Sequence, residues 1–226
     1  MRLLEITLDA ADLAAAYGFY AGDLGLPVSR RTADSLTLQA GASRLTFRRG
    51  EASGAAPFYH FAFNIHPARF ERARASVAAV TTLIHDLDGR EVFDFRSWDA
   101  TACYFLDPLG NVGELIARRQ LRSEAAPADP GILSVGEIGL VTGDVPGLTK
   151  RLVAELGANV YRDSAGEDFA ALGNEHGLLI LVSQGRTWYP DTGRAAIVAS
   201  LAVLLEAGDG QRWRIEAPAF SVQSNL

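Results

Sequence analysis

The sequence predicts an α+β fold in which repeated βαβββ units form curved mixed sheets. One observation is the order strand, helix and three strands, which occurs twice between residues 3 and 118. Another is a third occurrence of this order at a constant spacing from the first, which aligns Glu5 with Glu137 and Asp12 with Asp144. The last is a turn followed by an alternating strand, Asp107–Arg118, which closes the second unit.

The first unit spans residues 3–49. Residues 3–10 alternate as a strand and place Glu5 on one face with Thr7 and Asp9. Asp12 is placed to cap the following helix, and Gly25 to end it. Strands predicted over residues 28–32, 35–40 and 44–49 complete the unit.

The second unit spans residues 58–118 and repeats this order. A strand is predicted over 58–65, a helix from Pro67 to residue 79, and strands over 91–95, 101–106 and 112–118. Sliding the first strand of the chain onto the strand at 58–65 places Glu5 on His60. We expect the first two units to pair into one curved mixed sheet.

The remaining chain carries a third unit and part of a fourth. Residues 121–132 are rich in Ala, Pro, Asp and Ser, which is typical of a linker. The repeat then places Glu5 on Glu137, and strands over 169–172 and 178–183 close the third unit. A strand over 196–206 follows without a clear helix or a second turn-plus-Glu motif. We therefore predict a complete domain at 1–120, a linker at 121–132 and an incomplete second domain at 133–226.

The turn at residues 107–111 introduces an unusual strand. Val112, Glu114 and Ile116 share one face of it, so a carboxylate lies between two apolar neighbours. Burying that carboxylate alone would be unfavourable by several kcal/mol. Glu114 is therefore expected either to be solvated or to be paired with a cation.

Composition excludes several classes of function. The chain has 226 residues and a net charge of −6 at pH 7 without a basic cluster, which argues against nucleic acid and anionic membranes as partners. Cys103 is the only cysteine, so an internal disulfide and a CxxC motif are excluded, and we interpret it as a packing residue. No apolar run approaches the length of a membrane span, and early acidic residues interrupt any signal-peptide core. We expect a cytoplasmic protein that acts on a small molecule.

The repeated units, the helix end Phe19–Leu26 and the motif Asp107–Glu114 resemble the vicinal oxygen chelate superfamily. Its members include glyoxalase I, extradiol dioxygenases, fosfomycin-resistance enzymes, epimerases and bleomycin-binding proteins. The resemblance covers residues 3–118 well and 133–206 in outline. It implies the glyoxalase/bleomycin resistance/dihydroxybiphenyl dioxygenase-like fold, in which a metal ion lies in the cup of a curved sheet. The motif is specific for the fold and not for a reaction.

By position, the resemblance implies that Glu5, His60 and Glu114 are the metal ligands, and that Glu5 and Glu114 are the catalytic residues. Two carboxylates and one imidazole suit a divalent ion such as Mn²⁺, Ni²⁺, Fe²⁺, Zn²⁺ or Mg²⁺. Glu5 departs from the His or Gln more common at that position, so it is interpreted either as a displaceable ligand or as a general base. Of the three positions, the second half retains only Glu137.

Other residues are candidates for the walls of the cup. Arg48, Trp98 and Tyr104 are candidate pocket-lining residues, and a solvated arginine with packed aromatic rings is the alternative. The segment 185–190 either closes over a pocket or packs its aromatic side chains on the sheet. The remaining histidines are interpreted as surface residues: His66, His85 and His176.

The resemblance leads us to expect a metal-dependent, glyoxalase-like lyase or isomerase that acts on a small oxygen-chelating substrate. An extradiol-type ring-cleaving dioxygenase is the alternative within the enzymes. A metal-free protein that sequesters a small molecule or drug is the alternative outside them, and pairing of the inward carboxylates with arginines would favour it. The resemblance also implies either a homodimer that completes the cup or a third unit that takes the partner's place.

Overall fold

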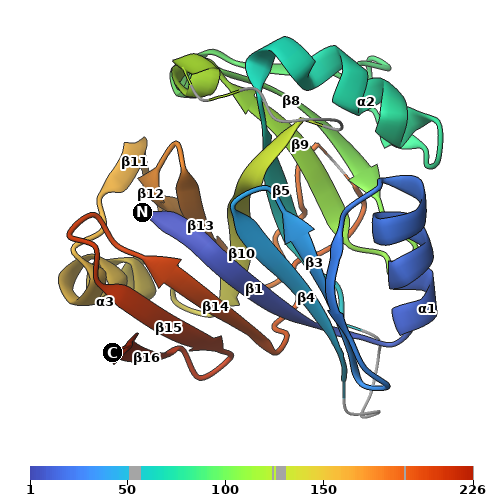
Figure 1. Ribbon diagram of the computed structural model, residues 1–226. Coiled ribbons are helices and arrows are strands. Elements are labelled where there is room, and N and C mark those ends of the chain that lie inside the picture. Colours follow the sequence, from blue (N-terminus) through green and yellow to red (C-terminus); the bar gives the residue numbers. More distant parts are fainter. Residues whose placement is uncertain (51–56, 124, 126–130, 191, 226) are drawn as a thin grey trace.

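The computed structural model describes residues 1–50, 57–123, 125, 131–190 and 192–225. Two sheets, one of seven strands and one of nine, pack against each other, and the longer helices lie around their edges with their buried side chains in the same apolar cluster as the facing strands (Figure 1). The α+β class and the repeated units are confirmed. None of the helices in these ranges is long and apolar enough to cross a membrane.

The first sheet has the strand order β16-β15-β14-β1-β4-β3-β2. In it β1 runs parallel to β4 and antiparallel to β14. Its strands are β1 (Arg2–Ala10), β2 (Val28–Arg31), β3 (Ser35–Ala40), β4 (Ser43–Arg49), β14 (Leu201–Glu206), β15 (Arg212–Ala217) and β16 (Ser221–Asn225).

The second sheet has the order β11-β12-β13-β10-β5-β9-β8-β6, with β7 paired to β8. Here β5 runs parallel to β9 and antiparallel to β10, which in turn runs parallel to β13. Its strands are β5 (His60–Ile65), β6 (Leu83–Ile84), β7 (Phe93–Phe95), β8 (Ala100–Leu106), β9 (Val112–Arg118), β10 (Ile132–Thr142), β11 (Val160–Ala165), β12 (Phe169–Asn174) and β13 (Gly177–Ser183).

The helices begin where the sequence predicts. Asp12 accepts hydrogen bonds from the backbone of the first helical turn, and Asp144 does the same for the third unit. The elements are α1 (Leu13–Ala16), which continues as the π-helix η1 (Tyr17–Asp23), the short helix η2 (Pro67–Arg69) leading into α2 (Phe70–Ala78), η3 (Arg96–Trp98), η4 (Arg119–Ser123) and α3 (Val145–Leu156). The fourth unit has no helix between β14 and β15, where a short turn joins the strands.

The pairing of the units differs from the prediction. The expectation that the first two units share one sheet is wrong: the first pairs with the fourth, through Ile6 and Val203, and the second pairs with the third, through Phe61 and Ile138. Alternation fixes which residues face inward, but the opening strands of all four units offer similar edges, so the pattern leaves the partner open. Each sheet therefore contains strands from both sides of residues 121–132, of which 124 and 126–130 lie outside the described residues.

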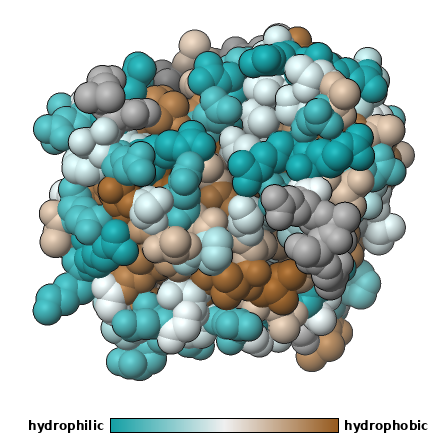
Figure 2. All heavy atoms as spheres, turned by 90° about the horizontal axis from the view of Figure 1, so that it is seen from below, coloured by the Kyte–Doolittle hydropathy of each residue, from teal (hydrophilic) through white to brown (hydrophobic). Residues whose placement is uncertain are grey.

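Two apolar clusters occupy the two faces of the second sheet. The larger lies between the two sheets and includes Ile6, Leu8, Phe61 and Leu140. The smaller includes Phe93, Tyr104, Ile116, Ile180 and Trp188 and lies on the opposite face of the second sheet. Hydrophilic residues cover most of the surface in Figure 2, and apolar residues show between them in patches.

Cys103 and the three remaining histidines differ in burial. Cys103 lies in the larger cluster, where burial raises the pKa of its thiol to about 12, so it is a packing residue as predicted. His85 is exposed and His176 half-buried. The interpretation of His66 as a surface residue is wrong, since the side chain is buried and its Nδ1 accepts a hydrogen bond from the backbone N–H of Ala68 at the start of η2.

Candidate metal centre

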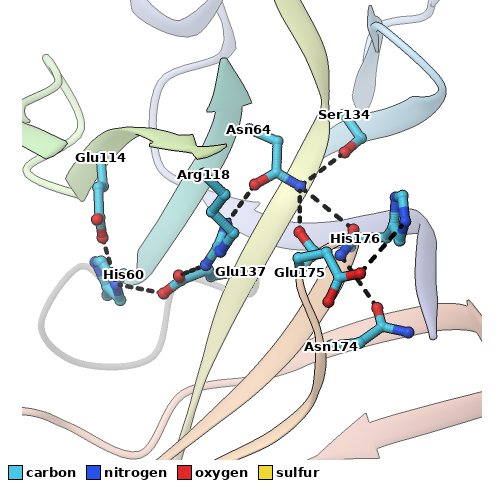
Figure 3. Close-up of polar contacts among 9 residues, drawn as sticks. All are labelled: His60, Asn64, Glu114, Arg118, Ser134, Glu137, Asn174, Glu175 and His176. Carbon is cyan, nitrogen blue, oxygen red and sulfur yellow. Dashed lines mark hydrogen bonds and ion pairs between the residues drawn. The ribbon is translucent and has the colours of Figure 1, made fainter. Parts of the chain in front are cut away.

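Three buried side chains that could ligate a metal converge on the face of the second sheet that carries the smaller apolar cluster. His60, Glu114 and Glu137 each offer one ligand atom, and these atoms all lie within 4.8 Å of one another. The residues come from β5, β9 and β10, which are adjacent strands (Figure 3). Their exposed fractions are 6%, 2% and 3%, so water contributes little to the solvation of the two carboxylates.

The repeat explains why these positions meet. His60 and Glu137 are equivalent residues of the second and third units, and pairing of Phe61 with Ile138 brings them to the centre of the strand pair. Glu114 pairs in register with Ala62, two residues beyond His60, so its side chain lies on the same face. The convergence thus follows from a local two-fold relation between two units.

The turn before β9 sets the position of Glu114. The carboxylate of Asp107 accepts hydrogen bonds from the backbone N–H groups of Leu109 and Asn111 at 2.9 and 2.8 Å. It also accepts one from the hydroxyl of Tyr20 at 2.6 Å. The turn predicted from the sequence is therefore present, and it ties the start of β9 to the helix of the first unit.

The imidazole of His60 is held in one orientation. Its Nδ1 lies 3.1 Å from the carbonyl oxygen of Val112, which can only accept, so Nδ1 carries the proton in the neutral ring. Nε2 then faces Oε2 of Glu114 at 3.5 Å and Oε2 of Glu137 at 3.9 Å. A ring anchored by Nδ1–H to a carbonyl, with Nε2 directed into a site, is the usual arrangement of a metal-binding histidine.

The two carboxylates have different surroundings. Oε1 of Glu137 accepts a hydrogen bond from the guanidinium of Arg118, which is fully buried. Glu114 instead accepts from the hydroxyl of Tyr104, and burial together with the charge of Glu137 raises the pKa of Glu114 well above its usual value, with Arg118 and Tyr104 opposing that rise. The pair is therefore asymmetric, with one carboxylate bonded to a cation and the other not.

A pocket of about 200 Å³ opens onto these three residues. Its walls are mainly aromatic, and the ring of Trp188 lies against His60 with 4.8 Å between ring centroids. Gly139 permits this approach, because a Cβ at that position would lie 2.6 Å from the indole. Besides the three ligand candidates, the lining residues are Phe95, Trp98, Tyr104, Ile116, Phe169, Ile180, Arg186, Trp188 and Tyr189.

Of the predicted wall residues, Trp98 and Tyr104 line this pocket, and so do three side chains of the segment 185–190. Arg48 does not. It lies on β4 in the first sheet, where its Nε donates to Asp9 at 2.6 Å and a terminal nitrogen donates to Ser200. Because β4 belongs to the other sheet, Arg48 has no access to the second sheet's cup.

Glu5 is not beside His60 and Glu114, contrary to the expected ligand set. It lies on β1 in the first sheet, where its carboxylate accepts hydrogen bonds from Arg44 at 2.8 Å and Thr46 at 3.1 Å. The cause is the pairing of β1 with β14 rather than with β5. Glu137 occupies the place expected for Glu5, and the constant spacing between the first and third units is the sequence signal that identifies it.

A fourth position of the centre carries no ligand. Ile180 of β13 pairs with Gly139 of β10, just as Glu114 of β9 pairs with Ala62 of β5. Ile180 is therefore the two-fold equivalent of Glu114. Its side chain is apolar and lines the pocket. The centre therefore has three potential protein ligands, and on the side toward Ile180 it opens into the pocket.

The donor set fits a divalent cation. One imidazole nitrogen and two carboxylate oxygens are ligands that Mn²⁺, Fe²⁺, Ni²⁺ and Zn²⁺ accept, and the oxygens also suit Mg²⁺. Two buried carboxylates face each other, while Arg118 is the only guanidinium in contact with either of them among the described residues. A divalent ion would supply the missing positive charge.

Comparison with known proteins supports the fold. No protein-family model and no curated protein sequence matches the chain. Among solved structures, a "putative dioxygenase" from Bacillus subtilis is similar, with a TM-score of 0.56 and 16% identity over 97% of this chain and 86% of its own. A glyoxalase I variant from Zea mays has a TM-score of 0.56 and 14% identity over 99% of this chain and 93% of its own. A second variant of that enzyme has a TM-score of 0.54 and 17% identity, covering 95% of this chain and 88% of its own.

These matches extend over nearly the whole chain, including both sheets. The chain therefore has the fold of the vicinal oxygen chelate superfamily that its sequence resembles.

Proposed function

We propose that this chain is a metal-dependent, glyoxalase-like enzyme, a lyase or isomerase that acts on a small oxygen-chelating substrate. The observation that carries the proposal is the group His60, Glu114 and Glu137, buried at the floor of an aromatic pocket. Buried acidic groups gathered in a pocket are candidates for a functional site rather than for stability, because their mutual repulsion is unfavourable without a cation. The fold shared with glyoxalase I of Zea mays is consistent with this function.

The three residues would hold the ion through Nε2 of His60 and one oxygen of each carboxylate. A bound divalent ion supplies Lewis-acid stabilisation of negative charge on the substrate's oxygens. The carbonyl of Val112 orients the imidazole, and Arg118 orients the carboxylate of Glu137, so two of the three ligands are fixed before anything binds.

Glu114 is assigned the proton transfer. It is the carboxylate that no guanidinium contacts, so of the two it is the one freer to leave the ion and exchange a proton with the substrate. It would accept a proton from a substrate carbon next to a carbonyl group and return it to the neighbouring carbon. The hydroxyl of Tyr104 orients the carboxylate that does this.

The pocket walls support a small, partly apolar substrate. Trp188 and Tyr104 flank His60 and exclude water from the ligand group. The side toward Ile180, where the two-fold equivalent of Glu114 is an apolar residue, leaves room for two substrate oxygens. Water excluded from this space would strengthen the electrostatic interactions within it.

Two alternatives have specific support. The match to the Bacillus subtilis structure supports a ring-cleaving dioxygenase as an alternative. However, iron oxygenases favour two histidines and one carboxylate, whereas the group here has one histidine and two carboxylates. The aromatic walls would also suit a metal-free protein that sequesters a flat compound. Such a protein gains nothing from two buried, facing carboxylates, which favours the metal-dependent enzyme.

The direct test is metal content. Protein purified without chelator is expected to carry about one divalent ion per chain, or to bind one when Mn²⁺, Ni²⁺, Fe²⁺ or Zn²⁺ is added. Glu114→Gln and His60→Ala are each expected to lose it, as measured by mass spectrometry of the elements after gel filtration. No binding by the wild-type protein of any of these ions contradicts the enzyme proposal and favours the sequestering protein.

A further inference from the structure

Arg118 is a buried cation next to the candidate metal centre. It holds Glu137, and its charge also affects which small molecule the pocket can bind. Its side chain is fully buried, and its two terminal nitrogens donate to Oε1 of Glu137 and Oδ1 of Asn64 (Figure 3). Its Nε has no hydrogen-bond partner among the described residues. A guanidinium remains charged in any protein environment, so this positive charge is permanent.

Asn64 fixes the guanidinium from the other side. The amide nitrogen of Asn64 donates to Oγ of Ser134 at 3.2 Å and to the carbonyl oxygens of Glu175 and His176 at 3.2 and 3.4 Å. With its NH₂ group committed to these acceptors, its Oδ1 faces Arg118. The guanidinium is therefore held by a network that is independent of any ion at the centre.

With a divalent ion bound, the charged groups of the centre would carry one positive charge in excess. Two carboxylates and one guanidinium carry a net charge of −1, and a divalent ion would change it to +1 with His60 neutral. Arg186 is the lining residue that carries a permanent positive charge, and its Nε already lies 3.5 Å from a carboxylate oxygen of Asp168. The pocket above the centre is otherwise aromatic or aliphatic, so little else would compensate the surplus.

We propose that Arg118 is a positioning residue that holds Glu137 by one oxygen and leaves the metal-loaded centre with one positive charge, so that the site selects a mono-anionic oxygen chelator with an apolar body. A carboxylate with an adjacent hydroxyl or carbonyl oxygen has this chemistry. The anion would compensate the surplus charge, and the apolar body would contact the aromatic walls. This inference rests on the proposed metal centre and names the class of ligand that it takes.

The test uses two probes of nearly the same shape. Mandelate carries a phenyl ring, a hydroxyl and a carboxylate, whereas mandelamide replaces the carboxylate by a neutral amide. Binding of each to the Co²⁺-loaded full chain is measured by calorimetry, and the visible spectrum of Co²⁺ reports whether its oxygen ligands change. Mandelate is expected to bind on the order of tenfold more tightly or better, because one uncompensated charge acts at short range in a site with little water.

Two variants locate the source of the preference. Arg118→Met removes the buried charge with little change of length and is expected to bring the two affinities within about threefold, while Arg118→Lys, which keeps the charge, is expected to retain the preference. Arg186→Met is the matched control, since it removes the arginine that lines the pocket, and it should preserve the preference. Loss of the preference in Arg186→Met but not in Arg118→Met would overturn the inference.

The wild-type measurement decides the matter even if Arg118→Met fails to fold. If the chain binds Co²⁺ but binds mandelate and mandelamide equally, or binds neither, the inference is contradicted. The proposed metal centre is not contradicted by either result. Failure of the wild-type chain to bind Co²⁺ contradicts the proposed function, and the inference falls with it.

Discussion

The two sheets present the same repeat position in two different settings. In the second sheet the position holds His60 and Glu137, whereas in the first sheet it holds Glu5 and, by the pairing of Ile6 with Val203, Ala202. In the first sheet, Thr46 is the equivalent of Glu114. Thr46 pairs with Thr7, two residues after Glu5, just as Glu114 pairs with Ala62, two residues after His60. A residue type that can ligate a metal is therefore present on both sheets, but only the second gathers three of them, among the described residues.

The cation next to each glutamate also differs. Glu5 pairs with Arg44, whose side chain is 49% exposed, and its own side chain is 26% exposed. Glu137 pairs with Arg118, and these side chains are 4% and 0% exposed. A solvated pair contributes about 0–1 kcal/mol to the free energy of unfolding, whereas breaking a buried pair is unfavourable by about 3–5 kcal/mol. The comparison indicates that burial, and not the repeat position, turns a glutamate into part of a centre.

The largest expected effect separates the two arginines. Arg118→Ala is expected to lower the free energy of unfolding of the metal-free protein by about 3–5 kcal/mol, because it leaves the carboxylate of Glu137 buried beside that of Glu114. Arg44→Ala, the matched change in the first sheet, is expected to lower it by about 1 kcal/mol or less. Urea denaturation of both variants measures the difference, and equal losses would contradict the comparison.

The next effect is stabilisation by metal. At a free ion concentration of 100 times Kd, a divalent cation is expected to raise the free energy of unfolding of the wild-type protein by about 2.7 kcal/mol. Glu114→Gln should show almost none of this gain, since it removes one of three ligands. Denaturation with and without the ion measures it, and a gain retained in full by Glu114→Gln would show that the ion binds elsewhere.

The pH dependence of the metal-free protein should come next in size. Because the pKa of Glu114 is raised above its unfolded value, the folded state holds an extra proton between the two pKa values. Stability from this group is therefore present below the unfolded pKa and decreases as pH rises toward the folded pKa, by at most about 1.4 kcal/mol per pH unit. Glu114→Gln is expected to flatten this part of the stability profile. An unchanged slope would show that the pKa of Glu114 is not raised in the folded protein.

The smallest effect is expected at Thr46. Thr46→Val removes one hydrogen bond to Glu5, which keeps its contact with Arg44, so the loss should be about 1 kcal/mol or less. Metal affinity should not change, because Thr46 lies in the other sheet. Calorimetric titration of the variant with Zn²⁺ checks this, and a weakened affinity would indicate that the centre lies in the first sheet.

The sequence predicted the units and much of the centre, but not the partners. Alternation and capping identified β1, β9 and the helix starts, and the repeat identified the equivalence of Glu5, His60 and Glu137. It could not show that β5 pairs with β10, because that choice depends on how two sheets bury their apolar faces against each other. Glu5 was therefore expected at the place that Glu137 occupies.

Arg118 was also beyond prediction from the pattern. It ends the strand that carries Glu114, where an arginine is ordinarily solvated, and only the approach of β10 and Asn64 buries it. The aromatic wall around Trp188 likewise depends on Gly139, whose missing side chain lets the loop approach the sheet. Both features follow from contacts between units rather than from a spacing within one.

The metal centre is assigned to the second sheet, and two matched variants test this placement most directly. The measurement is the metal stoichiometry of Glu137→Gln beside Glu5→Gln, taken after loading with Zn²⁺ and gel filtration. We predict about one ion per chain for Glu5→Gln, as for the wild-type protein, and a large loss for Glu137→Gln. A loss in Glu5→Gln with retention in Glu137→Gln would contradict the assignment and place the centre in the first sheet.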